Sequence, residues 1–189
     1  MKRGSSEEHV LTEQQLRTLW SKCTEQKDQM LVGLMAYCGL RVSEAIHLNA
    51  RWIKDEEIHI PSYMECRCQE CAARGHWKPK SKHGVRAVAI PEFLKPVFLK
   101  YLTRFPEGLK MTRQAAWYRV RLVCAAAGVP EVFPHALRAS CATFLASKGF
   151  TAVELCQYLG WARIAMGEHY IRIAEARSGS KQKIKQIWG

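Results

Sequence analysis

Basic side chains that could hold a phosphate group occur at three places along this chain. Arg41 lies in the segment GLRVSE at residues 39–44, directly after a glycine turn. His135 and Arg138 are three positions apart, so they lie on one face of a helix. Lys82 precedes a segment of alternating side chains that predicts a β-strand. Guanidinium groups bind phosphate oxygens through forked hydrogen bonds, so this set of residue types indicates chemistry on a phosphate ester.

Two aromatic residues follow the basic ones. Trp161 comes after a Leu-Gly pair, and Tyr170 lies nine residues further on, inside the next expected helix. Taken singly, each residue of the set has a structural explanation, because tyrosine and tryptophan often pack in a core. The order and spacing of the whole set, rather than one motif, point to a function.

This ordered set resembles the tyrosine recombinase, or phage integrase, family. That family shows Gly-Leu-Arg-x-Ser-Glu, a lysine in a β-hairpin turn, His-x-x-Arg, Leu-Gly-His or Leu-Gly-Trp, and then a tyrosine. All five elements occur here in the same order, between Thr12 and about Ile173. The resemblance implies a site-specific recombinase that acts on double-stranded DNA as a homotetramer, in integration, excision or resolution. It also implies that catalysis needs neither ATP nor a metal cofactor.

The resemblance assigns a role to each polar residue of the set. Tyr170 attacks the DNA phosphate and forms a 3′-phosphotyrosyl bond. A phenol with an ordinary pKa is ionised in roughly one molecule per thousand at pH 7, so it needs a base and a positive field. His135 is the expected base, and Arg41 and Arg138 stabilise the charge on the non-bridging oxygens. Lys82 is expected to protonate the 5′ hydroxyl that leaves.

Two positions of this set admit a second interpretation. Lys80 lies two residues before Lys82 and could take its role. Lys82 is preferred as the general acid because residues 81–85 resemble the hairpin turn of lambda-type integrases. Trp161 stands where many relatives have histidine. Its indole N–H can hold a phosphate oxygen but cannot transfer a proton.

A cysteine cluster lies in an irregular insert, residues 61–84, between the second and third expected strands. Cys66, Cys68 and Cys71 are followed by His76, so four soft ligands occur within eleven positions. The cluster predicts a structural zinc site that stiffens the lysine-bearing hairpin, and the alternative is a flexible loop with free thiols. The other five cysteines are scattered among apolar residues, where a free thiol behaves as a small buried hydrophobe.

The pattern of apolar residues predicts a mainly α-helical fold with a small three-stranded antiparallel sheet, as in the catalytic domain of a tyrosine recombinase. Thr12 with Gln15, and Thr151 with Glu154, predict capping boxes at two helix starts. The strands are expected over residues 52–54, 58–60 and 85–90. One helix is expected to begin at residue 12 and a short one near residue 43. Further helices are expected over residues 27–37, 91–104, 112–127, 135–148, 151–159 and 164–176.

One catalytic domain is expected over residues 1–177, followed by a tail over residues 178–189. The tail is amphipathic, and Ile184, Ile187 and Trp188 could dock into a neighbouring subunit or onto their own domain. Relatives also carry a second, N-terminal helical domain that closes around DNA. The sequence leaves open whether this chain is a fragment or a minimal protein.

The composition favours an anionic partner. The chain has 189 residues and a formal net charge of +12, from 29 Lys and Arg against 17 Asp and Glu, which favours nucleic acid. It has no apolar run of transmembrane length and no signal peptide pattern, so we expect an intracellular protein, cytoplasmic or nucleoid-associated, without a membrane partner. A type IB topoisomerase and a DNA-binding module without catalysis remain as alternative functions.

Overall fold

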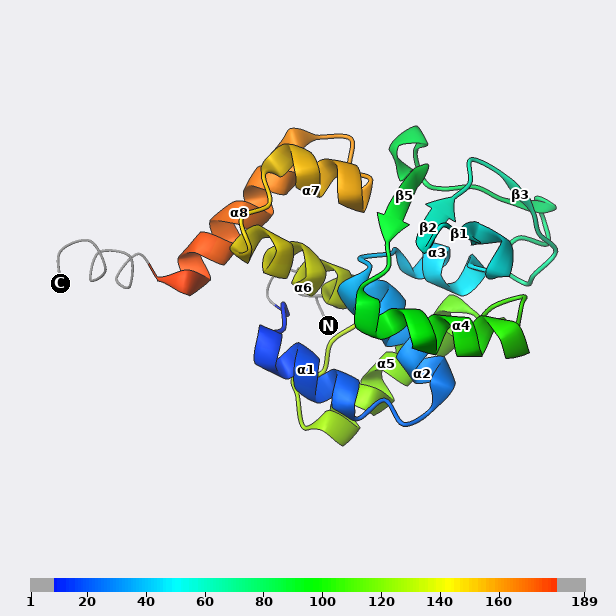
Figure 1. The fold of residues 1–189 in the computed structure, drawn as a ribbon, viewed down its shortest axis with the longest axis horizontal. Coiled ribbons are helices and arrows are strands. Elements are labelled where there is room, and N and C mark those ends of the chain that lie inside the picture. Colours follow the sequence, from blue (N-terminus) through cyan, green and yellow to red (C-terminus); the bar gives the residue numbers. More distant parts are fainter. Residues whose placement is uncertain (1–8, 180–189) are drawn as a thin grey trace.

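Helices dominate the computed structural model, which describes residues 9–179 (Figure 1). The helices are α1 (Glu13–Ser21), α2 (Gln26–Val32), α3 (Val42–His47), α4 (Lys95–Arg104), α5 (Arg113–Ala127), α6 (Pro134–Ser147), α7 (Ala152–Leu159) and α8 (Ile164–Ser178). The strands are β1 (Ile53–Lys54), β2 (Glu57–Ile60), β3 (Met64–Glu65), β4 (His76–Trp77) and β5 (Arg86–Ala89). The predicted mainly α-helical class is confirmed. The expected tail residues Ile184, Ile187 and Trp188 lie outside the described part of the chain.

The three predicted strands form one antiparallel sheet in the order β1-β2-β5. Ile58 of β2 is fully buried and pairs with Ile53 on one side and Val88 on the other. A second sheet, β3 paired with β4, lies inside residues 61–84, where irregular chain was expected. Its strands are two residues long, too short for an alternating pattern to appear in the sequence.

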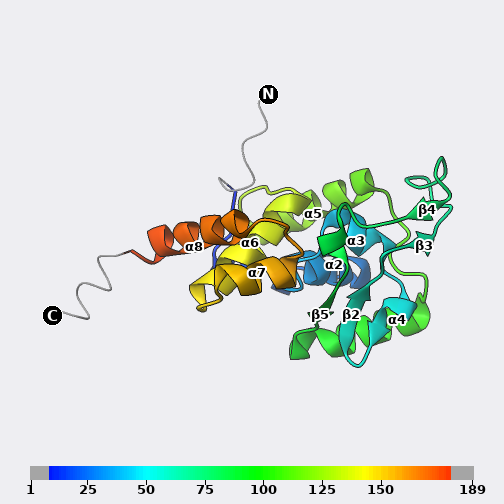
Figure 2. The same ribbon diagram turned by 90° about the horizontal axis from the view of Figure 1, so that it is seen from above.

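The helices form two groups (Figures 1 and 2). At one end of the molecule, α8 packs along α6 and α7. At the other end, α2 packs against α4 and α5 beside the sheet. Helix α6 joins the groups, because it also packs against the π-helical turn Gly33–Tyr37 that follows α2. The chain passes from this turn through residues 38–41 to α3, which packs against the turn and against α5. None of the helices within residues 9–179 is both long enough and apolar enough to cross a membrane.

Gly39 fixes the approach of this turn to α7. Its φ is 63°, in the left-handed region that glycine adopts without strain. A Cβ atom at this position would lie 2.5 Å from Cδ2 of Leu159, at the end of α7. The close contact sets how near the segment that carries Arg41 lies to the chain that leads into α8.

Replacing Gly39 therefore tests this contact. Gly39→Ala is expected to lower the free energy of unfolding by about 2–3 kcal/mol, because a steric clash adds to the strain of left-handed backbone. Gly128→Ala is the matched control, since its φ is 62° and no atom lies within 4 Å of the added Cβ. The control is expected to lose about 1 kcal/mol. Urea unfolding of both variants measures the difference, and equal losses would contradict a close contact with Leu159.

Candidate active site

A buried carboxylate, Glu44, lies among three arginines. It belongs to the first turn of α3, and 1% of its surface is exposed. Arg41 Nη1 donates to Oε1 at 2.8 Å, and Arg86 Nη2 donates to Oε2 at 3.1 Å. Arg138 Nη1 lies 3.8 Å from Oε2. Since an unpaired buried charge is strongly destabilising, this one carboxylate makes the burial of several guanidinium groups tolerable.

Backbone carbonyls at the end of α7 fix two of these arginines. Arg41 Nη2 donates to the carbonyl of Gly160 at 2.8 Å. Arg138, which is 2% exposed, donates from Nη2 to the carbonyl of Leu159 and from Nη1 to that of Gly39 at 2.5 Å. The last carbonyls of a helix have no partner within the helix, so they are available as acceptors. Both guanidinium groups are thereby held in place before a substrate binds.

The charge state of Arg138 reflects its surroundings. Burial, together with the positive charge of Arg41, lowers the pKa of Arg138 to about 9, while Glu44 opposes the change. The guanidinium therefore stays positively charged at neutral pH. For Glu44, burial alone would raise the pKa of the carboxyl, but the charges and hydrogen bonds of Arg86, then Arg138 and Arg41, hold it below its ordinary value.

Trp161 and Tyr170 stack face to face beside the arginines. Their ring centroids are 5.1 Å apart and their planes differ by 9°. Arg138 Cζ lies 5.7 Å from the centre of the Trp161 ring. Tyr170 is on α8 and is 3% exposed. The turn between α7 and α8 thus brings Tyr170 onto Trp161, whose ring lies beside Arg138.

His135 lies one helical turn before Arg138, at the start of α6. The protein around it, and then the positive charges of Arg138, Arg41 and Lys80, lower the pKa of His135 below its ordinary value. A lowered pKa keeps the imidazole neutral at pH 7. It can therefore accept a proton, which a general base must do.

The two lysines before β5 differ in their surroundings. The positive charge of Lys80 contributes to the lowered pKa of His135. Lys82 begins a short 3-10 turn and lines a groove of about 600 Å³ together with Trp161. The loop also contacts α7, because a Cβ at Gly160 would lie 2.6 Å from the carbonyl oxygen of His83.

The structure brings the predicted site residues into one region. Those joined by contacts or electrostatic interactions are Arg41, His135, Arg138, Trp161 and Tyr170, with Lys82 on the adjoining groove. Sequence reasoning missed the part of Arg86, which donates to Glu44 and also from Nε to the carbonyl of Tyr158 at 2.7 Å. The sequence shows that Arg86 is basic, but it does not show the partners of this residue, because they lie 42 and 72 positions away along the chain.

The expected metal ligands are brought together in part. Sulfur atoms of Cys66, Cys68 and Cys71 lie with a ring nitrogen of His47, and all four atoms are within 4.8 Å of one another. The expectation of His76 as the fourth ligand is corrected, since the described chain puts His47 in that place. The C-terminal end of α3 packs against the insert, through contacts between residues 21 and 24 positions apart.

His76 has other contacts. Its Nδ1 lies 2.8 Å from the carbonyl oxygen of Arg74, and its ring stacks on Tyr63 with 5.3 Å between ring centroids. It is on β4, paired with Glu65. His76 therefore belongs to the outer face of the second sheet rather than to the thiol cluster.

Comparison with known proteins agrees with this geometry. The sequence model of the phage integrase family matches residues 9–177, so the chain belongs to that family. Tyrosine recombinase XerD of Neisseria meningitidis serogroup A is 28% identical over 170 residues, which cover 87% of this chain and 58% of the relative. The chain spans about half the length of the curated relatives it matches.

The fold is that of solved recombinases. The crystal structure of XerA recombinase superposes with a TM-score of 0.72 at 19% identity, over 95% of this chain and 63% of the other. The Tn1549 transposon integrase, solved in complex with circular intermediate DNA, gives a TM-score of 0.69 at 19% identity. The match covers 98% of this chain and 68% of the integrase chain. These likenesses establish the fold of the chain.

Glu44 supplies a test that depends on pH. Its pKa is lower in the folded chain than in the unfolded chain, so its contribution to stability is complete above the ordinary pKa of 4.5 and is lost as the pH falls below it. Glu44→Gln is expected to cost about 3 kcal/mol at pH 7, because it leaves three arginines without their counter-charge. It is also expected to lose less further stability between pH 5 and pH 3, roughly the range in which carboxyls titrate.

The matched control is Glu13→Gln, which removes an exposed ion pair with Arg17. Little change in stability is expected there. Thermal unfolding at a series of pH values compares the three proteins. Equal acid sensitivity of the wild type and Glu44→Gln would contradict the role of Glu44.

Proposed function

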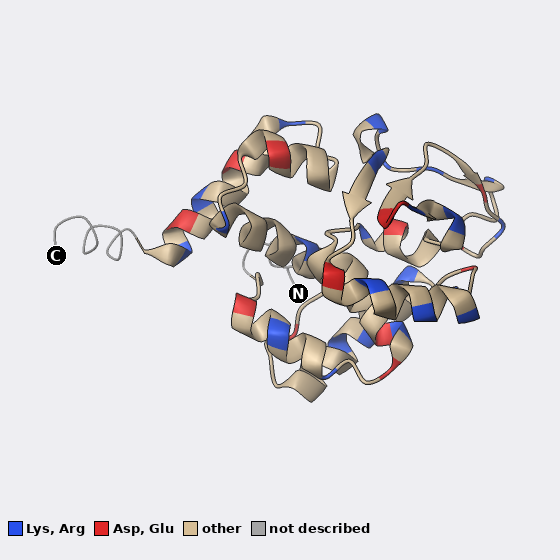
Figure 3. Cartoon of the chain, in the orientation of Figure 1, with Lys and Arg blue, Asp and Glu red and all other residues tan. Residues whose placement is uncertain are grey.

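We propose that this domain cleaves and rejoins double-stranded DNA as a site-specific tyrosine recombinase, through a 3′-phosphotyrosyl intermediate on Tyr170. The observation that carries the proposal is the position of Tyr170, stacked on Trp161 beside the guanidinium of Arg138. The DNA in the Tn1549 integrase complex supports a DNA partner. So does the net charge of +12, with basic residues spread over the helices and the insert as well as the loop before β5 and the loop between α7 and α8 (Figure 3).

The arginines hold the phosphate in this proposal. A guanidinium has five N–H donors, and the contacts of Arg41 and Arg138 with Glu44 and the carbonyls use only some of them. The remaining donors can bind the non-bridging oxygens, where negative charge accumulates during in-line attack. Loss of one such fixed donor typically costs about 3–4 kcal/mol of activation free energy. Trp161 can add one indole N–H.

Proton transfer is assigned to His135 and a lysine. Neutral His135 accepts the phenol proton of Tyr170 as its oxygen bonds to phosphorus. A lysine of the loop before β5 donates a proton to the departing 5′ oxygen. Lys82 is assigned this step, because it lines the same groove as Trp161, and Lys80, two residues earlier, is the alternative.

Strand exchange follows from the same bond. The phosphotyrosyl ester keeps the energy of the original phosphodiester, so a 5′ hydroxyl of a second strand can attack it without ATP. Exchange between two duplexes needs four cleavages, one on each strand. A homotetramer on DNA supplies one active site for each cleavage.

Covalent trapping tests the nucleophile. Wild-type protein with nicked duplexes carrying XerD- or XerA-type sites is expected to give protein-linked DNA after denaturation in detergent, and Tyr170→Phe is expected to give none. Tyr118→Phe is the control, since Tyr118 is an exposed residue of α5. An adduct that persists in Tyr170→Phe would refute the assignment. Recombinant products separate a recombinase from a topoisomerase, which would only relax supercoils.

A modified substrate tests the general acid. Lys82→Ala is expected to slow cleavage of ordinary DNA by about 100-fold or more, because the alkoxide leaves unprotonated. With a 5′-bridging phosphorothiolate, sulfur leaves without a proton, so the rate of Lys82→Ala is expected to return close to that of the wild type. Lys80→Ala is the matched comparison. Rescue of Lys80→Ala alone would reassign the acid to Lys80.

A further inference from the structure

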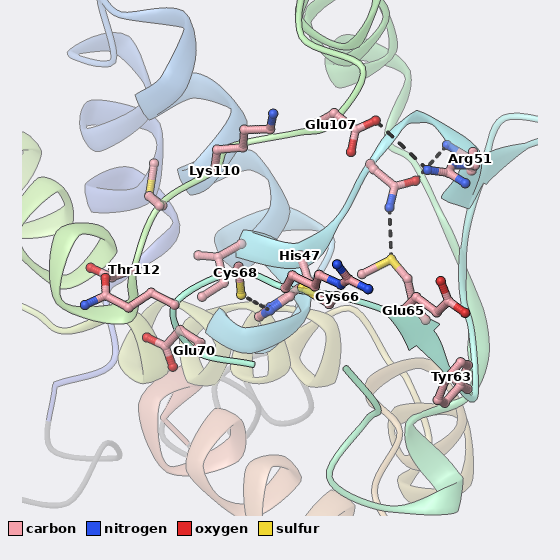
Figure 4. Close-up of a pocket in the computed structure, with 16 residues that line it drawn as sticks. His47, Arg51, Tyr63, Glu65, Cys66, Cys68, Glu70, Glu107, Lys110 and Thr112 are labelled. Carbon is pink, nitrogen blue, oxygen red and sulfur yellow. Dashed lines mark hydrogen bonds and ion pairs between the residues drawn. The ribbon is translucent and has the colours of Figure 1, made fainter. Parts of the chain in front are cut away.

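The cysteine cluster lies apart from the arginines and the tyrosine and has no part in the proposed cleavage. Three thiols come from residues 61–84, and one imidazole comes from the last residue of α3. Figure 4 shows His47 pointing toward the sulfur of Cys68, at the wall of a cavity of about 870 Å³ between the insert and the segment before α5. Three sulfurs and one nitrogen are a donor set that zinc prefers.

The distances fit a tetrahedral ion. Nε2 of His47 lies 3.3 Å from Sγ of Cys68 and 3.3 Å from Sγ of Cys71. In a zinc site with bonds of about 2.3 Å to sulfur and 2.0 Å to nitrogen, tetrahedral angles separate the ligand atoms by roughly 3.5–3.8 Å. The two nitrogen–sulfur distances therefore lie a few tenths of an ångström from those of a zinc site, and all four atoms lie within 4.8 Å of one another.

The imidazole is held in the orientation that a ligand needs. Nδ1 of His47 lies 2.7 Å from the carbonyl oxygen of Ser43. A carbonyl can only accept, so Nδ1 carries the proton and Nε2 presents its lone pair to the thiols. The ring also stacks on Trp77, with 5.6 Å between centroids, and Trp77 Nε1 donates to Ser43 Oγ at 3.0 Å. Contacts on two sides thus fix the ring.

The backbone of the insert forms a closed turn around the thiols. The amide of Cys71 donates to the carbonyl of Cys68 at 2.9 Å, and the amide of Gly75 donates to the carbonyl of Cys71 at 2.9 Å. The amide of Cys66 donates to the carbonyl of Gly75 at 3.0 Å. Three sulfurs separated in sequence are therefore held on one side of a short loop that faces His47.

We propose that His47, Cys66, Cys68 and Cys71 bind one structural zinc ion that fastens the insert to α3. The insert has little apolar material of its own, since Cys71 and Trp77 are its buried apolar side chains within the described chain. A metal ion supplies the cross-link that a small segment without a core lacks. The bound ion would also tie two parts of the candidate active site together, because Arg41 directly precedes the helix that His47 ends, and the insert itself carries Lys80 and Lys82.

Metal analysis of the purified full chain is the first test. About one zinc per chain is expected in the wild type, as in other closed four-ligand sites. Cys68→Ser, at an exposed position, is expected to lower the affinity for zinc at least about 10-fold without disturbing the core. His47→Gln is expected to do the same. His76→Asn is the matched control and is expected to keep wild-type zinc content, since His76 lies outside the cluster.

Two further measurements keep the test independent of DNA cleavage. Cobalt added to metal-free wild-type protein is expected to give the intense visible absorption of tetrahedral thiolate coordination, with a weaker spectrum in Cys68→Ser. Hydrogen exchange is expected to show faster exchange of residues 61–84 after removal of zinc, while α6 and α8 stay protected.

Two results would overturn the proposal. One is a wild-type protein that binds neither zinc nor cobalt and yet shows full protection of residues 61–84 from hydrogen exchange. That result would indicate free thiols or a disulfide. The other is loss of zinc in His76→Asn with retention in His47→Gln. Neither result would bear on the recombinase proposal, because trapping at Tyr170 is a separate measurement.

Discussion

The interaction on which the rest of this site depends is the set of contacts between the Glu44 carboxylate and three arginines. Arg41, Arg86 and Arg138 come from three different parts of the chain and converge on this one group. Burial of three positive charges without a counter-charge would cost far more than a small domain can tolerate. The carboxylate therefore fixes at once where the short helix α3 lies, how β5 approaches α7, and how deeply α6 is buried.

The same arrangement leaves the site ready for an anion. Three guanidiniums against one carboxylate leave two positive charges in excess, and the carbonyls at the end of α7 hold Arg41 and Arg138 without cancelling their charge. In the proposed reaction this excess of positive charge would act on the phosphodiester. Because the guanidinium donors are already oriented, little reorganisation would be needed as negative charge develops, which is the main source of electrostatic catalysis.

The insert over residues 61–84 needs stabilisation of a different kind. A loop of this length between two strands loses much conformational entropy when it is ordered, and its two short strands bury few side chains. Backbone turns, the stacking of Trp77 on His47, and the ion pair between Glu70 and Arg113 supply part of the stabilisation. The thiol cluster lies where one more cross-link would join the insert to α3, the helix that Arg41 directly precedes.

The sequence by itself determined the features that depend on neighbours along the chain. The capping boxes of Thr12 and Thr151 are present, and the strands and helices lie close to the predicted ranges, because caps and hydrophobic periods act within one or two turns. Only the tertiary structure decided that Arg86 joins Glu44, and that His47 rather than His76 faces the cysteines. Residues far apart in sequence meet through the packing of whole elements, and no local spacing encodes that meeting.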